Sequence, residues 1–335
     1  MDSGSFDIAA FLKTLHELGY KGPIGLQCYG IGGDAHDHLA RSMAAWQKLS
    51  GADSKLAFTE SGKEYSFDTG VLRGMLRTQG KSVGLGPLLD CASGTNVSRF
   101  HGIFSHYRMF DSNTRYGEAA WDWASTAQLL TNGAVEVRWT ADTAHPYDMT
   151  ALYRWSKPDT LDLLTTVALK TNVSRFEIFL ASYFEGFPSS FVSAKGDIPV
   201  FIETKQPNGD WQAFPRDEEA AKIIADGRWT RPPHPVDWKI MPRYASPLGI
   251  RRDAASGLTG LVMAPTSDCF AVLSPYGAES HRSMYLSLFG RDFKAGETAS
   301  ARSRLVIGHN ITDDKATAIY EAYAKEIGRS GDRSQ

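Results

Sequence analysis

The sequence lacks a strong net charge, a long apolar run and an even set of cysteines. Its 36 Lys and Arg residues nearly balance 38 Asp and Glu residues, so nothing predicts binding to nucleic acid or to an anionic membrane. No apolar run approaches the roughly 18 residues of a membrane-spanning helix. Cys28, Cys91 and Cys269 have no metal-ligand spacing, and an odd number argues against a disulfide framework. Because the N-terminus also shows no secretory signal, a cytoplasmic location is expected.

The first 50 residues predict a helix, a strand and a second helix. Apolar residues recur at helical spacing through residues 6–18, and Gly19 follows where a helix end belongs. A short apolar run covers residues 24–29, and Asp34 can cap a second helix that extends to Trp46. Such a unit cannot bury a parallel strand by itself, so it needs a partner surface.

This segment resembles part of a known barrel family. Residues 4–30, GSFDIAAFLKTLHELGYKGPIGLQCYG, followed by HLARSMAAWQKL, are similar to the last helix–strand–helix of xylose-isomerase-like TIM-barrel sugar-phosphate isomerases and epimerases. In that family the last strand presents a metal-binding glutamate, but Gln27 stands at the matching place, and a neutral amide is a poor substitute for a carboxylate. No metal site is therefore expected. The segment is either a fusion remnant, or Met1 is an internal start after an upstream barrel domain.

From residue 56 onward the pattern changes to alternation between apolar and polar residues, which predicts β-strands. Short turns between successive strands imply an antiparallel meander. Helices are expected at residues 216–225 and 313–327. Without a short repeat that would indicate a propeller, a large two-sheet β-sandwich fits best. The expected strands include residues 135–139, 149–155, 161–167 and 176–180.

Three domains are expected on this basis. They are the barrel-derived segment of residues 1–50, the β-sandwich of residues 56–310, and a C-terminal helix with a polar tail at residues 311–335.

The β-rich region resembles the galactose mutarotase-like (aldose 1-epimerase) superfamily. Residues 147–187, YDMTALYRWSKPDTLDLLTTVALKTNVSRFEIFLASYFEGF, are similar to the middle of aldose 1-epimerases. FHGIFSHYRMF at residues 100–110 resembles the histidine- and arginine-bearing segment that lines the sugar site of that family. SLFGRDFKAGETASARSRLVI at residues 287–307 resembles its closing strands. The resemblance implies a mainly β, antiparallel supersandwich and a carbohydrate ligand.

One position departs from the family pattern. Where the family has a histidine that acts as general acid, this sequence has Ala181, followed two residues later by Tyr183. Mutarotation needs a base for the anomeric hydroxyl proton and an acid for the ring oxygen. The resemblance implies that the base is a glutamate late in the chain, for which Glu279 is the closest match and Asp268 the rival. His106 is expected to serve as the acid, with Tyr183 as the other candidate.

Polar and aromatic residues near these positions are expected to bind substrate. On a strand, His106 and Arg108 would share one face, with His101 close by, which supplies proton-transfer groups and a donor fork for hydroxyls. The alternative is a set of hydrogen-bonded histidines at a sheet rim. Trp121 and Trp123 would also share one face and could stack on a sugar ring, although most tryptophans in a sandwich belong to the core.

Residues 227–248 contain five prolines and are expected to form a long ordered loop at the edge of the site or a packing strap across a sheet. The loop carries Trp229, His234 and Trp238. The substrate-binding residues expected from all of these patterns are His101, Arg108, Trp121, Trp123, Tyr183, Trp229, His234, Trp238, Asp268 and His281.

The expected function is carbohydrate processing without a cofactor. Its most concrete form is an isomerase or epimerase that acts on an aldose or on an oligosaccharide end by acid/base chemistry. A non-catalytic carbohydrate-binding sandwich, once fused to a sugar-phosphate isomerase barrel, is one alternative. A polysaccharide lyase-like supersandwich is another, because one sandwich fold supports many activities.

Overall fold

The computed structural model describes residues 7–20, 22, 24–25, 32–34, 37–38, 41–42, 46, 56–80, 84–196 and 199–331. The first expected helix is confirmed as α1 (Ile8–Glu17), where the Asp7 carboxylate accepts a hydrogen bond of 2.9 Å from the Ala10 amide. Gly19 follows with a positive φ of 70°, as expected at a helix end. Gln27, Cys28 and most of the expected strand and second helix lie outside the described residues.

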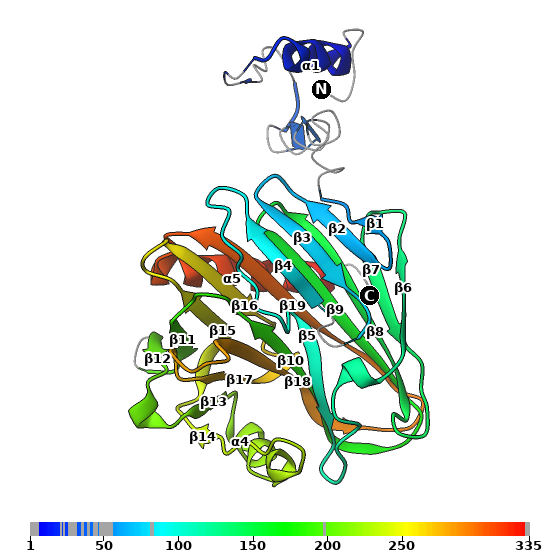
Figure 1. Ribbon diagram of the computed structural model, residues 1–335, viewed down its shortest axis with the longest axis vertical. Helices are drawn as coiled ribbons and strands as arrows, with labels where there is room; N and C mark the ends of the chain where they lie inside the picture. The colour runs from blue at the N-terminus through cyan, green and yellow to red at the C-terminus, as the bar shows by residue number, and fades with distance from the viewer. Residues whose placement is uncertain are drawn as a thin grey trace.

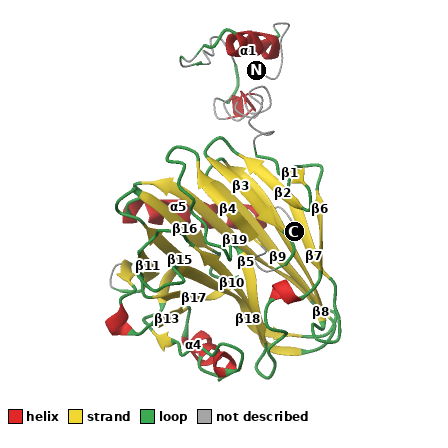
Figure 2. Ribbon diagram, viewed as in Figure 1, coloured by secondary structure: helices red, strands yellow, loops and turns green. Residues whose placement is uncertain are grey.

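The described residues from 56 onward form three sheets, shown in Figures 1 and 2. The four-stranded sheet has the order β1 (Thr59–Ser61), β2 (Glu64–Asp68), β3 (Leu72–Arg77), β4 (Gly84–Asp90). The six-stranded sheet has the order β14 (Lys239–Ile240), β13 (Trp211–Pro215), β17 (Cys269–Pro275), β18 (Ser283–Phe293), β10 (Val173–Tyr183), β5 (Ser105–Phe110). The nine-stranded sheet has the order β12 (Val200–Glu203), β11 (Ser189–Ala194), β15 (Tyr244–Arg252), β16 (Leu258–Met263), β19 (Thr298–His309), β9 (Thr160–Leu169), β8 (Tyr147–Lys157), β7 (Val135–Trp139), β6 (Ser125–Leu129).

The expected mainly β, antiparallel sandwich is confirmed, since β13 and β14 form the one parallel pair among the named strands of the described ranges. The meander is confirmed for β6 to β9, which pair in chain order. It is wrong for β10, which crosses to the six-stranded sheet and pairs there with β5 and β18. The reason is that β10 is buried on both faces over most of its length, so it needs a central place between two strands.

The six-stranded sheet buries both of its faces. Its inner face carries residues such as Ile178 and Leu180, which belong to the large core shared with the nine-stranded and four-stranded sheets. We call the opposite face the pocket face. It carries Phe179, Ala181 and Tyr285, which pack with the short helix α4 (Glu218–Ile224) and with tryptophans from the segment after α4.

The helices α4 and α5 (Asp313–Gly331) lie at the periphery of the sheets (Figure 2). The expected helices are confirmed as α4 and α5; α5 covers part of the outer face of the nine-stranded sheet through Tyr320 and Tyr323. Short 3-10 helices are η1 (Ala120–Asp122), η2 (Gln206–Asn208) and η3 (Arg228–Thr230). None of the helices within the described ranges has the length and apolar character needed to cross a bilayer.

A buried ion pair joins β10 to the segment after α4. Arg228 Nη1 lies 3.1 Å from Glu177 Oε2, and both side chains are fully buried. Ser287 donates to the other Glu177 oxygen at 2.7 Å, and Asp226 accepts from Arg228 Nη2 at 2.8 Å. Burial raises the pKa of the Glu177 carboxyl, and the adjacent Arg228 opposes that rise. The pair thus fixes η3, and with it Trp229, on the pocket face.

We expect Glu177→Ala to lower the free energy of unfolding by about 3–5 kcal/mol, because it leaves the Arg228 charge buried with only part of its partners. The exposed pair Lys222–Glu219 is the matched control, and Glu219→Ala should cost less than about 0.5 kcal/mol. Urea unfolding monitored by tryptophan fluorescence gives both values. Similar small losses in the two variants would contradict a structural role for the buried pair.

Candidate active site

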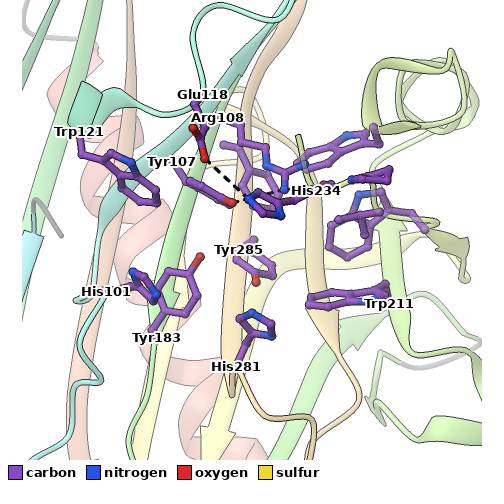
Figure 3. Close-up of a pocket in the computed structure, with 15 residues that line it drawn as sticks. His101, Tyr107, Arg108, Glu118, Trp121, Tyr183, Trp211, His234, His281 and Tyr285 are labelled. Atoms are coloured by element: carbon purple, nitrogen blue, oxygen red, sulfur yellow. Dashed lines mark hydrogen bonds and ion pairs between the residues drawn. The ribbon is translucent and has the colours of Figure 1, made fainter. Parts of the chain in front are cut away.

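A pocket of about 390 Å³ opens on the pocket face of the six-stranded sheet (Figure 3). Strands β5, β10 and β18 form its floor. Its walls are formed by the start of β13 and by the loops after β4, β5, η3 and β17. It is lined by His101, Tyr107, Arg108, Glu118, Trp121, Phe179, Tyr183, Trp211, Trp229, His234, Pro235, Val236, Trp238, His281 and Tyr285.

Aromatic rings make up most of the pocket floor. The strand register places Ala181 opposite Tyr285, and alternation along β10 puts Phe179 and Tyr183 on the same face as Ala181. Phe179 stacks on Tyr285 with ring centroids 4.5 Å apart. Trp238 lies edge-on to Trp229 at 5.4 Å. Flat apolar faces of this kind bind the apolar faces of ring-shaped ligands.

Arg108 is the buried cation of this pocket. Its guanidinium lies 4.9 Å from the Tyr107 ring centroid and 5.2 Å from that of Trp229, a cation–π arrangement. Its Nη2 donates to the His234 carbonyl oxygen at 2.8 Å, which holds the loop of residues 231–236 against the site. Among the described residues, its Nε and Nη1 have no hydrogen-bond partner.

His106 does not share a face with Arg108, contrary to the sequence prediction. Arg108 pairs with Phe179 and His106 with Leu180, so a β-bulge at Tyr107 turns the two side chains to opposite faces of the sheet. His106 lies in the inner core, with Nε2 2.8 Å from the Thr165 hydroxyl and its ring 5.6 Å from Trp139. Burial lowers its pKa to about 3. The structure therefore does not bring His106 to the pocket.

A carboxylate–imidazole pair stands at the pocket wall. His281 Nδ1 lies 2.9 Å from Glu279 Oε1, and the His281 amide donates to Oε2 at 2.7 Å. Burial alone would raise the pKa of Glu279, but hydrogen bonds from His281 and Ser280 outweigh that effect and lower it. His281 lines the pocket, whereas Glu279 is not among the lining residues. The carboxylate orients the ring, which leaves Nε2 available for proton transfer.

The turn that carries this pair is fixed by a buried arginine. Arg251, on β15, donates to the carbonyl oxygens of Gly277 and Ser283 at 2.7 Å each and to that of Phe187 at 3.2 Å. Burial lowers the pKa of Arg251 to about 9. Because these bonds hold both ends of the turn, His281 is presented to the pocket from a rigid support.

Trp121 and Trp123 occupy different environments, whereas the sequence predicted one shared strand face. The segment forms η1, a 3-10 helix, so the two-residue alternation of a strand does not apply. Trp121 lines the pocket and stacks on Tyr107 at 4.9 Å. Trp123 is buried in the core and stacks on His145 at 4.2 Å.

Asp268 is also outside the pocket. It is 7% exposed and forms an ion pair of 2.7 Å with Arg302 Nε on β19. Its Oδ2 also accepts from the Arg302 amide at 2.9 Å. Asp268 therefore joins the two large sheets and has no route to the ligand space.

Two loops meet above the pocket. Arg115 donates to the Pro233 carbonyl oxygen at 2.5 Å and to that of Glu118 at 2.7 Å, which connects the loop after β5 to the loop of residues 231–236. His234 Nε2 lies 3.7 Å from Glu118 Oε1, the pair marked by a dashed line in Figure 3. The expected long loop at the site edge is thus observed between η3 and β14, although β15 begins at Tyr244 within its predicted range.

Most of the predicted binding residues line this pocket. His101, Arg108, Trp121, Tyr183, Trp229, His234, Trp238 and His281 do so, while Trp123 and Asp268 do not.

Several lining residues were not predicted, among them Tyr107, Glu118, Phe179, Trp211 and Tyr285. Alternation from Tyr183 could have indicated Phe179, whereas Tyr285 depends on a register that only the fold defines. Within the described ranges, no cluster of three or more His, Cys, Asp or Glu side chains is placed to hold a metal ion.

Neither a protein-family model nor a curated protein matches this chain. Solved structures do. An α-N-acetylgalactosaminidase from Bifidobacterium bifidum matches with a TM-score of 0.50 and 12% identity, over 79% of this chain and 39% of that one. A galactose mutarotase-like protein from Lactobacillus casei ATCC 334 matches with a TM-score of 0.44 and 8% identity, over 76% of this chain and 100% of that one. A heparan sulfate lyase from Pedobacter heparinus matches with a TM-score of 0.44 and 10% identity, over 83% of this chain and 42% of that one.

At these identities the likeness concerns the fold alone. It rests on the α-N-acetylgalactosaminidase, which has the highest TM-score of the three structures. The chain spans about two-fifths of the length of the glycosidase and of the lyase. The match to the glycosidase agrees with the fold described above. The three matches do not bear on the barrel resemblance of residues 4–49, which stays a prediction.

The burial of His106 predicts a specific acid sensitivity. Its folded pKa of about 3 lies below the ordinary value of 6.5, so the unfolded chain binds a proton in this interval and the folded protein does not. Stability must therefore fall as the pH drops below 6.5. Between pH 7 and pH 5 we expect the wild type to lose about 2 kcal/mol from this group.

The His106→Gln variant should not show this fall in the free energy of unfolding between pH 7 and pH 5. Urea unfolding midpoints measured at the two pH values would test this. His234→Gln, at an exposed position, should keep the wild-type acid dependence. Equal acid sensitivity of wild type and His106→Gln would refute the burial of a neutral imidazole.

Proposed function

We propose that this protein processes a carbohydrate, and that the pocket performs acid/base chemistry of the isomerase or epimerase kind on an aldose or an oligosaccharide end. The observation that carries the proposal is an imidazole, His281, oriented by a carboxylate and presented to a pocket with aromatic walls. The α-N-acetylgalactosaminidase that shares the fold was solved with GalNAc, which agrees with a carbohydrate ligand.

His281 is the proposed base. Glu279 holds Nδ1, so that Nε2 can accept the anomeric hydroxyl proton, and the resulting imidazolium is stabilised by the carboxylate beside it. The role expected for Glu279 is therefore carried out through His281, since Glu279 is not among the lining residues.

Tyr183 is the proposed donor to the ring oxygen. It lies on the pocket face, two residues after Ala181, and its ring centroid is 5.1 Å from that of His101. Burial raises the pKa of the Tyr183 phenol well above its ordinary value, so the hydroxyl keeps its proton and polarises the ring oxygen by a hydrogen bond. The proton that the ring oxygen gains on opening is the one taken from the anomeric hydroxyl and returned by the His281 imidazolium. His106 cannot take this role from the inner core. Arg108 and the aromatic floor would hold the sugar ring and its hydroxyls.

A non-catalytic carbohydrate-binding role is the second candidate. The observation that favours it is Ala181, which places a methyl group on the pocket face where the resembled family has its acid. An aromatic pocket without a strong acid would still bind a sugar.

Proton NMR exchange spectroscopy on a panel of aldoses separates the two candidates. The wild type should accelerate anomeric exchange, and His281→Gln should slow it by at least about 100-fold, the usual contribution of a general base. Glu279→Gln should also slow exchange while saturation-transfer contacts persist. The matched control is His309→Gln, because His309 forms a similar pair with Asp90 at 3.2 Å but does not line the pocket.

Contacts without accelerated exchange would establish the binding role instead. A wild-type rate in the His281→Gln variant would rule out the proposed base. The absence of both contacts and exchange across the panel would overturn the carbohydrate proposal as a whole.

A further inference from the structure

Phe100 is the most exposed phenylalanine, tyrosine or tryptophan among the described residues, at 67% of its full accessibility. Leaving a phenylalanine in water forgoes about 1.5–3 kcal/mol of burial free energy. A single exposed apolar side chain is ordinary on a protein surface, so its meaning depends on where it lies.

The backbone that carries Phe100 is fixed at the edge of the pocket. Arg77 on β3 donates to the Phe100 carbonyl oxygen at 3.0 Å. The Arg99 amide donates to the Tyr183 carbonyl oxygen at 2.9 Å, and the Tyr183 amide donates to that of Gly102 at 3.0 Å. The backbone of Tyr183 therefore holds the loop on both sides of Phe100, and the Tyr183 ring lines the pocket. This support pre-organises the exposed ring.

The Phe100 ring continues the aromatic wall of the pocket outward. It meets the His101 ring edge-on, with centroids 5.4 Å apart. His101 also contacts Tyr183 at 5.1 Å and Trp121 at 6.0 Å, both of which line the pocket. A ligand that fills the pocket and extends past His101 would next meet the Phe100 ring.

Arg77 adds polar recognition beside this ring. Its guanidinium carbon lies 5.8 Å from the Phe100 ring centroid. Its hydrogen-bond acceptors are the carbonyl oxygens of Gly86 and Phe100, and a guanidinium has five N–H donors, so donors are left for hydroxyl groups. A sugar residue presents an apolar C–H face and polar hydroxyl groups. The Phe100 ring can stack on the first, and the Arg77 guanidinium can donate hydrogen bonds to the second.

We infer that Phe100 and Arg77 form a second subsite, which takes the next residue of an oligosaccharide whose end occupies the pocket. The inference rests on the proposed carbohydrate function and narrows its substrate to chains of at least two sugar residues. A protein partner fits this surface poorly. In the loop of residues 92–103, Phe100 is the one large apolar side chain that is exposed, and a stable protein interface buries over about 1,200 Å².

Paired titrations of monosaccharides and disaccharides test the subsite. The probes are galactose with β-1,4-galactobiose, and glucose with maltose and cellobiose, so that each disaccharide has at its reducing end the monosaccharide it is compared with. Each is titrated by calorimetry into wild-type protein. For the pair that binds, we expect the disaccharide to bind about tenfold more tightly, equivalent to about 1.4 kcal/mol from one stacked ring. In Phe100→Ala the ratio of the two affinities should fall from about ten to about one.

Phe100→Trp should restore the ratio, because it keeps a flat ring at the same place. Val200→Ala is the control for loss of an exposed apolar side chain and should leave the ratio at about ten, since Val200 does not line the pocket. Monosaccharide binding with no gain for any disaccharide would overturn the subsite alone. The subsite would also be overturned if the Phe100→Ala variant still bound the disaccharide about tenfold more tightly than the monosaccharide. Binding of no probe would overturn the subsite together with the carbohydrate proposal.

Discussion

The buried ion pair between Arg228 and Glu177 is the interaction on which the pocket side of this protein depends. A strand such as β10, buried on both faces, tolerates a carboxylate only where a cation and hydrogen-bond donors satisfy it, and Arg228 and Ser287 do so. The partner cation comes from η3, so neutralising the carboxylate also fixes the segment after α4. That segment places Trp229 against Phe179, with ring centroids 4.6 Å apart. The aromatic floor and the wall that faces it are therefore parts of one packed unit.

A single extra residue in β5 determines which of its polar side chains reach the pocket. The bulge at Tyr107 directs Arg108 to the pocket face and His106 to the inner core, where burial keeps the imidazole neutral. Ala181 removes the imidazole that the resembled family would supply from β10. In the proposed function, proton transfer is assigned to His281 with Glu279, and hydrogen bonding to the ring oxygen is assigned to Tyr183. In the proposed function, the groups that act on the sugar therefore come from other positions than in the resembled family.

The pocket is largely preformed. Arg251 holds the His281 turn, Arg115 connects the two loops above the site, and Arg108 fixes the loop of His234 through its carbonyl oxygen. In each case an arginine side chain binds main-chain carbonyl oxygens and thereby sets the position of a loop, and of the three only Arg108 also lines the pocket. Binding then requires little ordering of the protein, which favours affinity for a small polar ligand.

The sequence by itself determined the fold class, the meander of β6 to β9, the helices α1, α4 and α5, and most of the aromatic and basic residues around the pocket. It could do so because alternation, helical periodicity and turn residues are local properties of the chain. Tertiary structure decided the place of β10, the opposite faces of His106 and Arg108, the separation of Trp121 from Trp123, and the structural role of Asp268. Each of these depends on a strand register, a bulge or an ion partner distant in the chain, and local patterns do not specify such pairings. The hydrogen bond between Glu279 and His281 joins residues two positions apart. Only the fold, however, determines that His281 lines the pocket and that Glu279 does not.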